Sequence, residues 1–210
     1  MNPYETRRYL AEYLLFHYGS PRELCPYPFA PKAAFHFHRR IVRECLLPLH
    51  FSSPTRGLDL GCAVGGLTHE LAKVVDEATG IDNSRQFIRA ARQHTKSRHI
   101  KFRVGDAMTV TGQYHVVLAV NLICRLPNPR QFLAHLPELV LSGGQLVLAT
   151  PYSWLTQYTA RRYWIQPGEL PKLLAPAFVL KRRRDLPFLI REHERKFQFV
   201  VSDVLTFVRR

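Results

Sequence analysis

The chain has 210 residues, of which 46% are hydrophobic and 22% are charged, a balance that is typical of a globular protein and excludes an intrinsically disordered one. Its 30 Lys and Arg residues against 16 Asp and Glu residues give a net charge of +14, which favours an anionic partner. No base-stacking module accompanies these basic residues, so a nucleic-acid partner is not expected. No segment approaches the roughly 20 apolar residues of a membrane span, and the N-terminus lacks a signal-peptide pattern, so we expect a cytoplasmic protein without membrane association.

The first 55 residues have a helical pattern. Apolar positions recur at helical spacing over residues 4–18, and Gly19 follows as a candidate C-cap. A proline-rich loop is expected over residues 21–31, followed by a second helix over residues 33–47 that Pro48 ends. The N-terminal segment therefore predicts two helices.

From residue 56 onward, short β-branched runs alternate with helical patterns, which predicts a mainly parallel α/β sheet. The expected strands are residues 57–60, 78–81, 100–104, 116–120 and 145–150, and the expected helices between them are 67–75, 84–94 and 129–139. Residues 141–144 are expected to form a tight turn before the fifth strand. The chain ends in two further strands, 178–182 and 196–208, which are joined by a loop and predict an antiparallel hairpin at the sheet edge.

The first predicted strand leads into a glycine-rich turn that opens a helix, with the sequence Asp59-Leu60-Gly61-Cys62-Ala63-Val64-Gly65. In an open parallel sheet such a turn marks the ligand crevice. A dinucleotide fingerprint requires glycine where Ala63 lies, because the backbone must approach a pyrophosphate there. Asp59 would also place a negative charge beside that pyrophosphate. Both features count against a nicotinamide dinucleotide.

Acidic residues near the ends of three predicted strands suit S-adenosylmethionine instead, which has no phosphate and is cationic. Asp59 can interact with the methionine moiety, Asp82 can accept hydrogen bonds from both ribose hydroxyls, and Asp106 can accept one from the adenine amino group beside Ala107. The alternative is that these acids are turn or cap residues, as Ser84 is for its helix. The remaining candidate cofactor residues are Gly61, Cys62, Ala63, Gly65, Asn83, Ser84 and Asn121. The four cysteines have no metal-ligand spacing, so they are interpreted as reduced thiols and no metal site is expected.

Residues 57–150 resemble the class I S-adenosylmethionine-dependent methyltransferases, whose Rossmann-like sheet has seven strands with an antiparallel pair at its end. The segments around this block resemble one family more narrowly, the 5-thiohistidine (4-mercaptohistidine) N-methyltransferases of ovothiol biosynthesis. The resemblance rests on residues 4–6, 12–19, 26–29, 61–65, 121–127, 151–155 and 187–192. Where that family has Asn-Phe-Pro-Val-Arg, this chain has His-Phe-His-Arg-Arg at 36–40, and the loop before residue 100 is shorter than usual.

This resemblance implies a single methyltransferase domain over residues 1–210. Residues 1–55 would form a helical cap that contributes to the acceptor pocket, and residues 56–210 would form the core that binds S-adenosylmethionine. The implied reaction is N-methylation of the imidazole ring of 5-thiohistidine to give ovothiol A. The implied functional partner is the 5-histidylcysteine sulfoxide synthase, to which this domain is often fused.

Several residues could serve the acceptor. Those that could orient the imidazole or carry its proton are His17, Tyr18, His38 and Tyr152, although each could equally be an aromatic or polar residue packed in the fold. A small zwitterion needs its carboxylate anchored, and Arg125 is the first candidate, with Arg191 and Arg40 as second choices. The aromatic residues after the fifth strand are interpreted as a lid or as ordinary packing: Trp154, Tyr158 and Trp164.

Two alternative functions stay open at this point. One is a methyltransferase that acts on RNA or protein through its basic surface, for which the densest runs are residues 38–40 and 181–184. The other is a protein that keeps the cofactor fold without catalysis.

Overall fold

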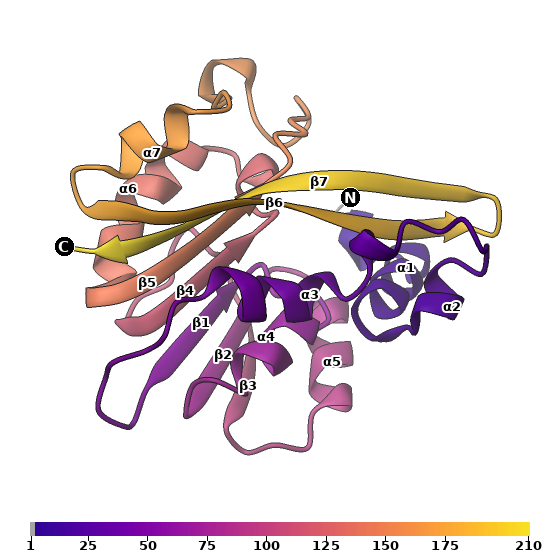
Figure 1. Ribbon diagram of the computed structural model, residues 1–210, viewed down its shortest axis with the longest axis horizontal. Helices are drawn as coiled ribbons and strands as arrows, with labels where there is room; N and C mark the ends of the chain where they lie inside the picture. Colours follow the sequence, from indigo (N-terminus) through magenta and orange to yellow (C-terminus); the bar gives the residue numbers. More distant parts are fainter. Residues whose placement is uncertain (1–2) are drawn as a thin grey trace.

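The computed structural model describes residues 3–210, which form one seven-stranded sheet in the order β3-β2-β1-β4-β5-β7-β6 (Figure 1). Strands β1 to β5 are mutually parallel, whereas β7 runs antiparallel to both β5 and β6. This confirms the predicted fold class, a mainly parallel sheet with an antiparallel C-terminal hairpin. The strands are β1 (Arg56–Leu60), β2 (Glu77–Asp82), β3 (Ile100–Val104), β4 (Tyr114–Val120), β5 (Val140–Thr150), β6 (Phe178–His193) and β7 (Lys196–Arg209).

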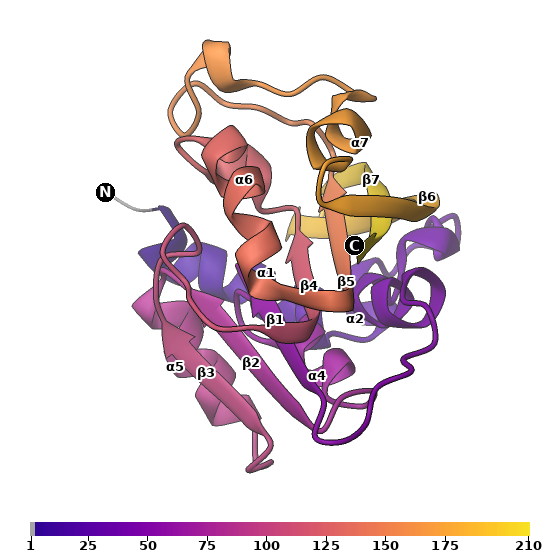
Figure 2. The same cartoon turned by 90° about the vertical axis from the view of Figure 1, so that its left-hand side faces the viewer.

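Helices cover both faces of this sheet (Figure 2). They are α1 (Arg7–Tyr18), α2 (Pro21–Leu24), α3 (Phe37–Arg40), α4 (Gly66–Leu71), α5 (Arg85–His94), α6 (Pro129–Leu139) and α7 (Glu169–Leu174), with 3-10 turns η1 (Pro3–Glu5), η2 (Lys32–Ala34), η4 (Ile123–Arg125) and η5 (Arg161–Tyr163) and a π-helical turn η3 (Ile41–Cys45). None of these described helices is long and apolar enough to cross a membrane.

The central strand β4 shows why the core has two halves. Val116 and Leu118 point to one face and pack in the cluster that contains α4. Val117 and Ala119 point to the other face and pack in the cluster that contains α6. Side chains alternate along a strand, so a strand that is buried on both faces is apolar on both, as residues 116–120 of β4 are.

The N-terminal prediction was wrong in two places. Residues 21–24 form the short helix α2, because Ser20 and Glu23 make a capping box at its start. The helix predicted over residues 33–47 is broken into η2, α3 and η3. The break lies at His36, which has a φ of 58° in the left-handed region and so cannot continue a right-handed helix.

The loop predicted between the last two strands was also wrong. β6 continues through the basic run 181–184 to His193, and only residues 194 and 195 separate it from β7. β6 is the edge strand of the sheet, and an edge strand tolerates basic residues because one of its sides faces solvent. It also tolerates Pro187, which lacks only a backbone N–H to donate to a neighbouring strand. The pairing of β7 with β5 ends at Asp203, so residues 186–202, here called the hairpin arm, extend past the parallel sheet.

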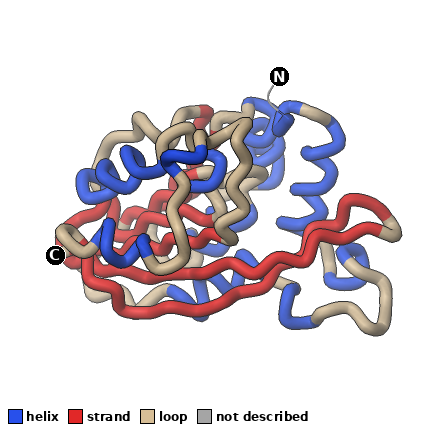
Figure 3. The backbone as a smooth tube through the Cα atoms, turned by 90° about the horizontal axis from the view of Figure 1, so that it is seen from above, coloured by secondary structure: helices blue, strands red, loops and turns tan. Residues whose placement is uncertain are grey.

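The hairpin arm packs against the N-terminal helices. β6 contacts α1, α2 and η2, and Leu189 packs in a small cluster with Leu24 and Phe35. Figure 3 shows the hairpin along the length of the molecule, with the N-terminal helices gathered around its tip. The structure differs from the prediction in two further places. The helix α7 was not predicted, and residues 141–144 belong to β5 instead of a separate turn.

Candidate active site

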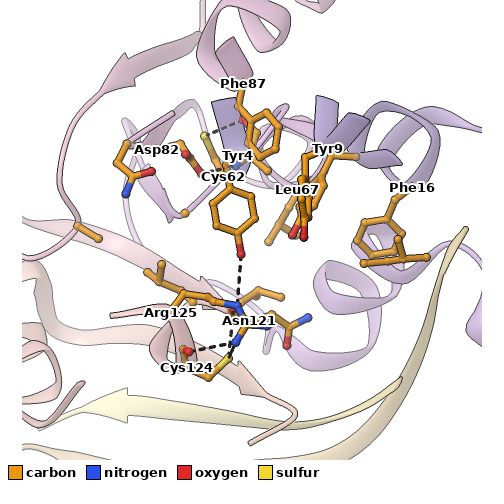
Figure 4. A pocket seen from close by; sticks show the side chains of 18 of the residues that line it. Tyr4, Tyr9, Phe16, Cys62, Leu67, Asp82, Phe87, Asn121, Cys124 and Arg125 are labelled. Atoms are coloured by element: carbon orange, nitrogen blue, oxygen red, sulfur yellow. Dashed lines mark hydrogen bonds between the residues drawn. The ribbon is translucent and has the colours of Figure 1, made fainter. Parts of the chain in front are cut away.

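A cavity of about 720 Å³ opens at the carboxyl ends of β1, β2 and β4, which is where an open parallel sheet binds ligands. α1, α3 and the hairpin arm close it from the other side. In Figure 4, Tyr4 lies between Asp82 on one side and Phe16 on the other. The cavity therefore has two halves, one beside the glycine-rich turn and one beside the hairpin arm.

The glycine-rich turn has a backbone that few residue types adopt. Gly61, Ala63 and Gly65 have φ angles of 72°, 48° and 91°. A Cβ atom on Gly65 would lie 2.6 Å from the Phe102 ring, so this position also needs glycine for space. Ala63 adopts the left-handed conformation without that freedom. Gly61, Cys62 and Ala63 line the cavity, whereas Gly65 shapes the turn from outside it.

Asp82 follows this turn at the end of β2. Its Oδ2 accepts a hydrogen bond from the Ala63 N–H at 2.9 Å, and its Oδ1 accepts one from the Ser84 N–H at 2.8 Å. Each carboxylate oxygen keeps a lone pair that can accept from a ligand hydroxyl. Ser84 itself caps α5 by accepting from the Phe87 N–H at 3.1 Å, and it does not line the cavity, whereas Asn83 does.

Asp59 is only 1% exposed and lines the cavity from β1. Its Oδ2 accepts a hydrogen bond from the Thr68 hydroxyl at 2.6 Å. Burial raises the pKa of Asp59 from 3.8 to about 7. The hydrogen bond from Thr68 lowers this pKa, and the negative charge of Asp82 raises it. A cationic ligand group beside Asp59 would stabilise its ionised form.

The third predicted acid, Asp106, lies at the exposed rim of the cavity. Its Oδ1 accepts from the Met108 N–H at 2.9 Å, the hydrogen bond of an Asx turn, and Ala107 beside it is buried. Asn121 follows β4 with a φ of 55°, and its Oδ1 accepts from the buried Ser202 hydroxyl at 2.7 Å. That hydrogen bond leaves the Asn121 amide nitrogen as the donor on the cavity wall.

The half beside the hairpin arm is aromatic. Its lining includes Phe16 from α1, Phe37 and His38 from α3, and Phe188 from β6. Ring centroids of Phe16 and His38 are 4.6 Å apart, and those of Phe37 and Phe188 are 4.9 Å apart. These flat side chains come from segments about 150 residues apart in the chain and suit a flat ligand.

Two histidines meet in this half. The rings of His17 and His38 have centroids 3.9 Å apart, and the His17 Nδ1 accepts from the Gly66 N–H at 3.0 Å, so its proton resides on Nε2. Burial lowers the pKa of His38 to about 3 and holds the pKa of His17 well below its ordinary value. Both imidazoles are therefore neutral at neutral pH.

Arg125 lies where the two halves join (Figure 4). Its Nε donates to the Tyr4 hydroxyl at 3.2 Å, and its Nη1 donates to the carbonyls of Ser153 at 2.8 Å and Cys124 at 3.0 Å. The guanidinium carbon also lies 5.3 Å from the Tyr158 ring centroid. Within residues 3–210 no hydrogen bond engages Nη2.

Four candidate acceptor residues do not line the cavity, namely Tyr18, Tyr152, Arg191 and Arg40. The Tyr18 hydroxyl donates to the Val64 carbonyl at 2.6 Å, and the Tyr152 hydroxyl donates to Asp203 at 2.7 Å. Arg191 donates to the Glu23 carbonyl. Arg40 pairs with Glu44 and donates to the Ala33 carbonyl. All four therefore hold neighbouring segments of the fold.

Of the three aromatic residues that were considered after β5, one lines the cavity and two do not. Tyr158 lines the cavity and stacks on Tyr4 with centroids 6.4 Å apart. The indole N–H groups of Trp154 and Trp164 instead donate to the carbonyls of Ile165 and Thr159. The two tryptophans thus hold this segment against the core, and Tyr158 is the member of the set that faces the cavity.

Sequence reasoning missed several lining residues. Glu12 is 8% exposed on α1, and Gln198 lies on the hairpin arm opposite Ile190. A signal existed for Glu12, because Phe16 follows it by four residues and an acid on the apolar stripe of a helix is uncommon. No local signal existed for Gln198, because its place in the cavity depends on the register of β6 and β7. Among the described residues no cluster of three or more metal-binding side chains occurs.

Comparison with known proteins defines the class of this fold and site. Residues 51–175 match the family model described as a methyltransferase domain, so the chain belongs to the methyltransferase domain family. The crystal structure of magnesium protoporphyrin IX methyltransferase from Synechocystis PCC 6803 with bound SAH has a TM-score of 0.67 and 18% identity, covering 99% of this chain and 97% of that one. The N-methyltransferase NodS from Bradyrhizobium japonicum WM9, in complex with S-adenosyl-l-homocysteine, has a TM-score of 0.64 and 18% identity, covering 97% and 99%.

Curated sequences agree at the level of the class. Ubiquinone biosynthesis O-methyltransferase from Coxiella burnetii is 26% identical over 122 residues, 49% of this chain and 52% of that protein. The Xanthomonas oryzae pv. oryzae protein of the same name is 29% identical over 101 residues, 45% of this chain and 42% of that protein. The match thus spans about half the length of these relatives. The chain therefore contains a methyltransferase domain with the fold of enzymes solved with S-adenosylhomocysteine bound, in agreement with the predicted fold, enzyme class and cofactor.

Proposed function

We propose that this enzyme methylates a ring nitrogen of 5-thiohistidine, giving ovothiol A, with residues 56–210 holding the cofactor and residues 1–55 completing the acceptor pocket. The observation that carries this proposal is the junction, in one cavity, of a half lined by Asp59 and Asp82 and an aromatic half that contains a neutral histidine pair. The segments that resemble the ovothiol family support it, because residues 4, 12–13, 16–17, 121–122 and 124–126 all line this cavity. The 5-histidylcysteine sulfoxide synthase, which would supply the precursor, is the proposed functional partner.

In this proposal three carboxylates hold the cofactor. Asp82 accepts from the ribose hydroxyls with the lone pairs that its backbone hydrogen bonds leave free, Asp59 accepts from the methionine ammonium group, and Asp106 accepts from the adenine amino group beside Ala107. The backbone of Gly61 and Cys62, with Asn83 and Asn121, completes the lining. When bound, S-adenosylmethionine supplies an electrophilic methyl group on its sulfonium sulfur.

The neutral histidine pair fits an imidazole acceptor. A ring nitrogen can attack a methyl group only through a free lone pair, and a charged neighbour would perturb the protonation of the ring. No hydrogen bond within residues 3–210 engages a ring nitrogen of His38, which lines the cavity and can accept from an acceptor N–H. The phenyl groups around it hold the ring flat and exclude water. The residues thus act by orientation, which is the main protein contribution to an in-line displacement.

Arg125 is the proposed anchor for the acceptor carboxylate. Because its Nη1 and Nε already bind Ser153, Cys124 and Tyr4, the anchor would act through Nη2 alone and not through a bidentate fork. Arg125→Leu should raise the acceptor KM about ten- to a hundredfold and leave cofactor affinity within about twofold. Arg191→Leu is the matched control, since Arg191 lies outside the cavity. An equal loss of cofactor affinity in Arg125→Leu would refute the anchor role.

The reaction is tested by incubating the enzyme with methyl-labelled S-adenosylmethionine and 5-thiohistidine, histidine, ergothioneine or tRNA. We expect label on a ring nitrogen of 5-thiohistidine and little on histidine, because a pocket that contacts the sulfur loses that contact in histidine. Equal rates with histidine, or methylation on sulfur, would refute the proposal.

The net charge of +14 favours the second candidate, a methyltransferase that acts on RNA or protein. Part of the basic run 181–184 is already engaged in the fold, however. Arg182 donates to the carbonyls of Glu44 and Leu46, and Arg183 pairs with Asp203 at 2.8 Å. Label in tRNA that disappears steeply with added salt would support this second candidate over the first.

A further inference from the structure

The end of the cavity between α1 and the hairpin arm carries oxygen atoms that the proposed reaction has not used. Glu12 lines the cavity from α1, and Gln198 lines it from β7. Gln198 pairs with Ile190 across the hairpin, and Ile190 lines the same cavity, so both polar side chains border one space.

One carboxylate oxygen of Glu12 is available to a ligand. Its Oε1 accepts a hydrogen bond from the Arg8 Nε at 2.7 Å, and within residues 3–210 no hydrogen bond engages its Oε2. Glu12 is 8% exposed, whereas the Arg8 side chain is 67% exposed. Arg8 does not line the cavity, so its ion pair engages Oε1 only and leaves Oε2 as the oxygen available to a ligand there.

Gln198 presents an oxygen as well. Its Nε2 donates to the Glu192 Oε1 at 2.9 Å, and a carboxylate can only accept, so the orientation of the amide is fixed. Glu192 is itself held by Arg8 at 3.3 Å and by Lys196 at 2.9 Å. Gln198 is exposed at the edge of the cavity, and its Oε1 is the acceptor that remains for a ligand beside the second Nε2 hydrogen.

Acidic residues also line the other half of the cavity, but there they have proposed partners in the cofactor. Glu12 is the acidic residue that lines the half beside the hairpin arm, among the residues that the structure describes. A buried carboxylate oxygen and an amide oxygen accept hydrogen bonds without donating any. A ligand group that satisfies both donates at least two hydrogen bonds, and positive charge strengthens each of them, which fits a primary ammonium.

We infer that Glu12 and Gln198 bind the α-ammonium group of the acceptor and thereby select an amino acid over a ring compound that lacks the amine. This inference rests on the proposed function, because it names the recognition of the same acceptor. Glu12 is a specificity-determining residue in this scheme, and Glu192 is a positioning residue that acts through Gln198.

The test uses equilibrium binding of two probes to the enzyme loaded with S-adenosylhomocysteine: 5-thiohistidine and its des-amino analogue, which keeps the ring, the sulfur and the carboxylate. We expect the wild type to bind 5-thiohistidine about tenfold or more tightly than the analogue. Glu12→Gln should lower the affinity for 5-thiohistidine about tenfold and leave the affinity for the analogue within about twofold. A wild type without preference for the amine, or an equal loss for both probes, would overturn the inference.

Two control variants separate recognition from a structural role. Arg8→Gln breaks the ion pair with Glu12 and a longer contact with Glu192, but it keeps the Glu12 carboxylate and leaves Lys196 and Gln198 as partners of Glu192. It should therefore weaken 5-thiohistidine binding less than Glu12→Gln does. If Arg8→Gln and Glu12→Gln are equally impaired, Glu12 acts only through Arg8 and the inference fails. Glu70→Gln removes an acidic residue that pairs with Lys73 outside the cavity, so it should match the wild type. Thermal unfolding and cofactor affinity confirm that each variant is folded.

The binding test and the methylation test can fail separately. Ring methylation of 5-thiohistidine combined with unchanged binding in Glu12→Gln would refute the role of Glu12 and keep the proposed reaction. Preference for the amine that depends on Glu12, without methylation of the ring, would refute the proposed reaction and keep the ammonium site.

Discussion

The two halves of the cavity are built in different ways. In the half beside the glycine-rich turn, Asp82 is held by backbone N–H groups of Ala63 and Ser84, which lie within 20 residues of it. In the half beside the hairpin arm, the Phe16 ring packs against the rings of Phe37 and Phe188. These three residues belong to α1, α3 and β6. The first half depends on local turns, and the second depends on the docking of the arm on the N-terminal helices.

Because the two halves are built differently, substitutions in them should have different effects on binding and stability. A change in a local turn should disturb the cofactor with little effect on the rest of the fold. A change in the arm should cost stability and acceptor binding together, because the same aromatic contacts serve both. Four experiments test this separation.

The largest effect is expected for Phe188→Ala. Phe188 is 6% exposed, and its ring centroid lies 4.9 Å from that of Phe37. Truncation of such a buried phenyl group should lower the free energy of unfolding by about 3 kcal/mol and weaken acceptor binding. Chemical denaturation measures the first effect. Phe29→Ala is the control, because Phe29 is 81% exposed and should change stability little. Loss of cofactor affinity in the folded Phe188→Ala enzyme would show that the halves are not separate.

Asp82→Ala should have the next largest effect, in the opposite half. It removes the acceptor proposed for the ribose hydroxyls and the two backbone hydrogen bonds that shape the turn. We expect cofactor affinity to fall about thirtyfold, with little change in the acceptor KM at saturating cofactor. Calorimetric titration with S-adenosylhomocysteine measures this, and wild-type affinity in the variant would place the cofactor elsewhere.

The pKa of Asp59 predicts a dependence on pH. Burial raises this pKa from 3.8 to about 7, so the protonated form is favoured in the folded protein without ligand. Stability from this group is therefore full below pH 4 and is lost as the pH rises to about 7. The affinity for cationic S-adenosylmethionine should rise about tenfold between pH 6 and pH 8, because only the ionised carboxylate attracts the ligand. Asp59→Asn should flatten this profile, and an unchanged slope in that variant would assign it to another group.

The smallest effect is expected for Ala63→Gly. Ala63 has a φ of 48°, and glycine relieves the strain of a Cβ atom in that region. The free energy of unfolding should rise by about 0.5 kcal/mol, since the greater freedom of glycine in the unfolded chain offsets part of the gain. Ala107→Gly is the control and should be destabilising, because Ala107 has no positive φ. A decrease in stability for Ala63→Gly would mean that the turn is not strained.

The same contrast explains which residues could be predicted. Asp59 and Asp82 were placed at the cavity because each lies near the end of a predicted strand, and parallel strands present their carboxyl ends at one edge. His17 and Tyr18 are neighbours in the chain, yet only His17 faces the cavity, because residues one apart on a helix point in different directions. Their phase relative to the cavity depends on how α1 docks.

The hairpin arm shows the limit of local pattern most clearly. Basic residues and Pro187 have low strand preference, and their sequence predicted a loop. The register of β6 with β7 overrode that preference and carried Phe188 and Gln198 to the cavity.

The sequence by itself determined the parallel sheet, its hairpin, the glycine-rich turn and the acidic residues beside it, because periodicity and turn chemistry act over a few residues. Only the tertiary structure decided the half of the cavity beside the hairpin arm. Glu12, His38, Arg125 and Gln198 belong to four segments, and no local rule relates segments that are far apart. Their meeting follows from burial of the apolar faces of α1, α3 and the hairpin arm against one another, which depends on the whole chain.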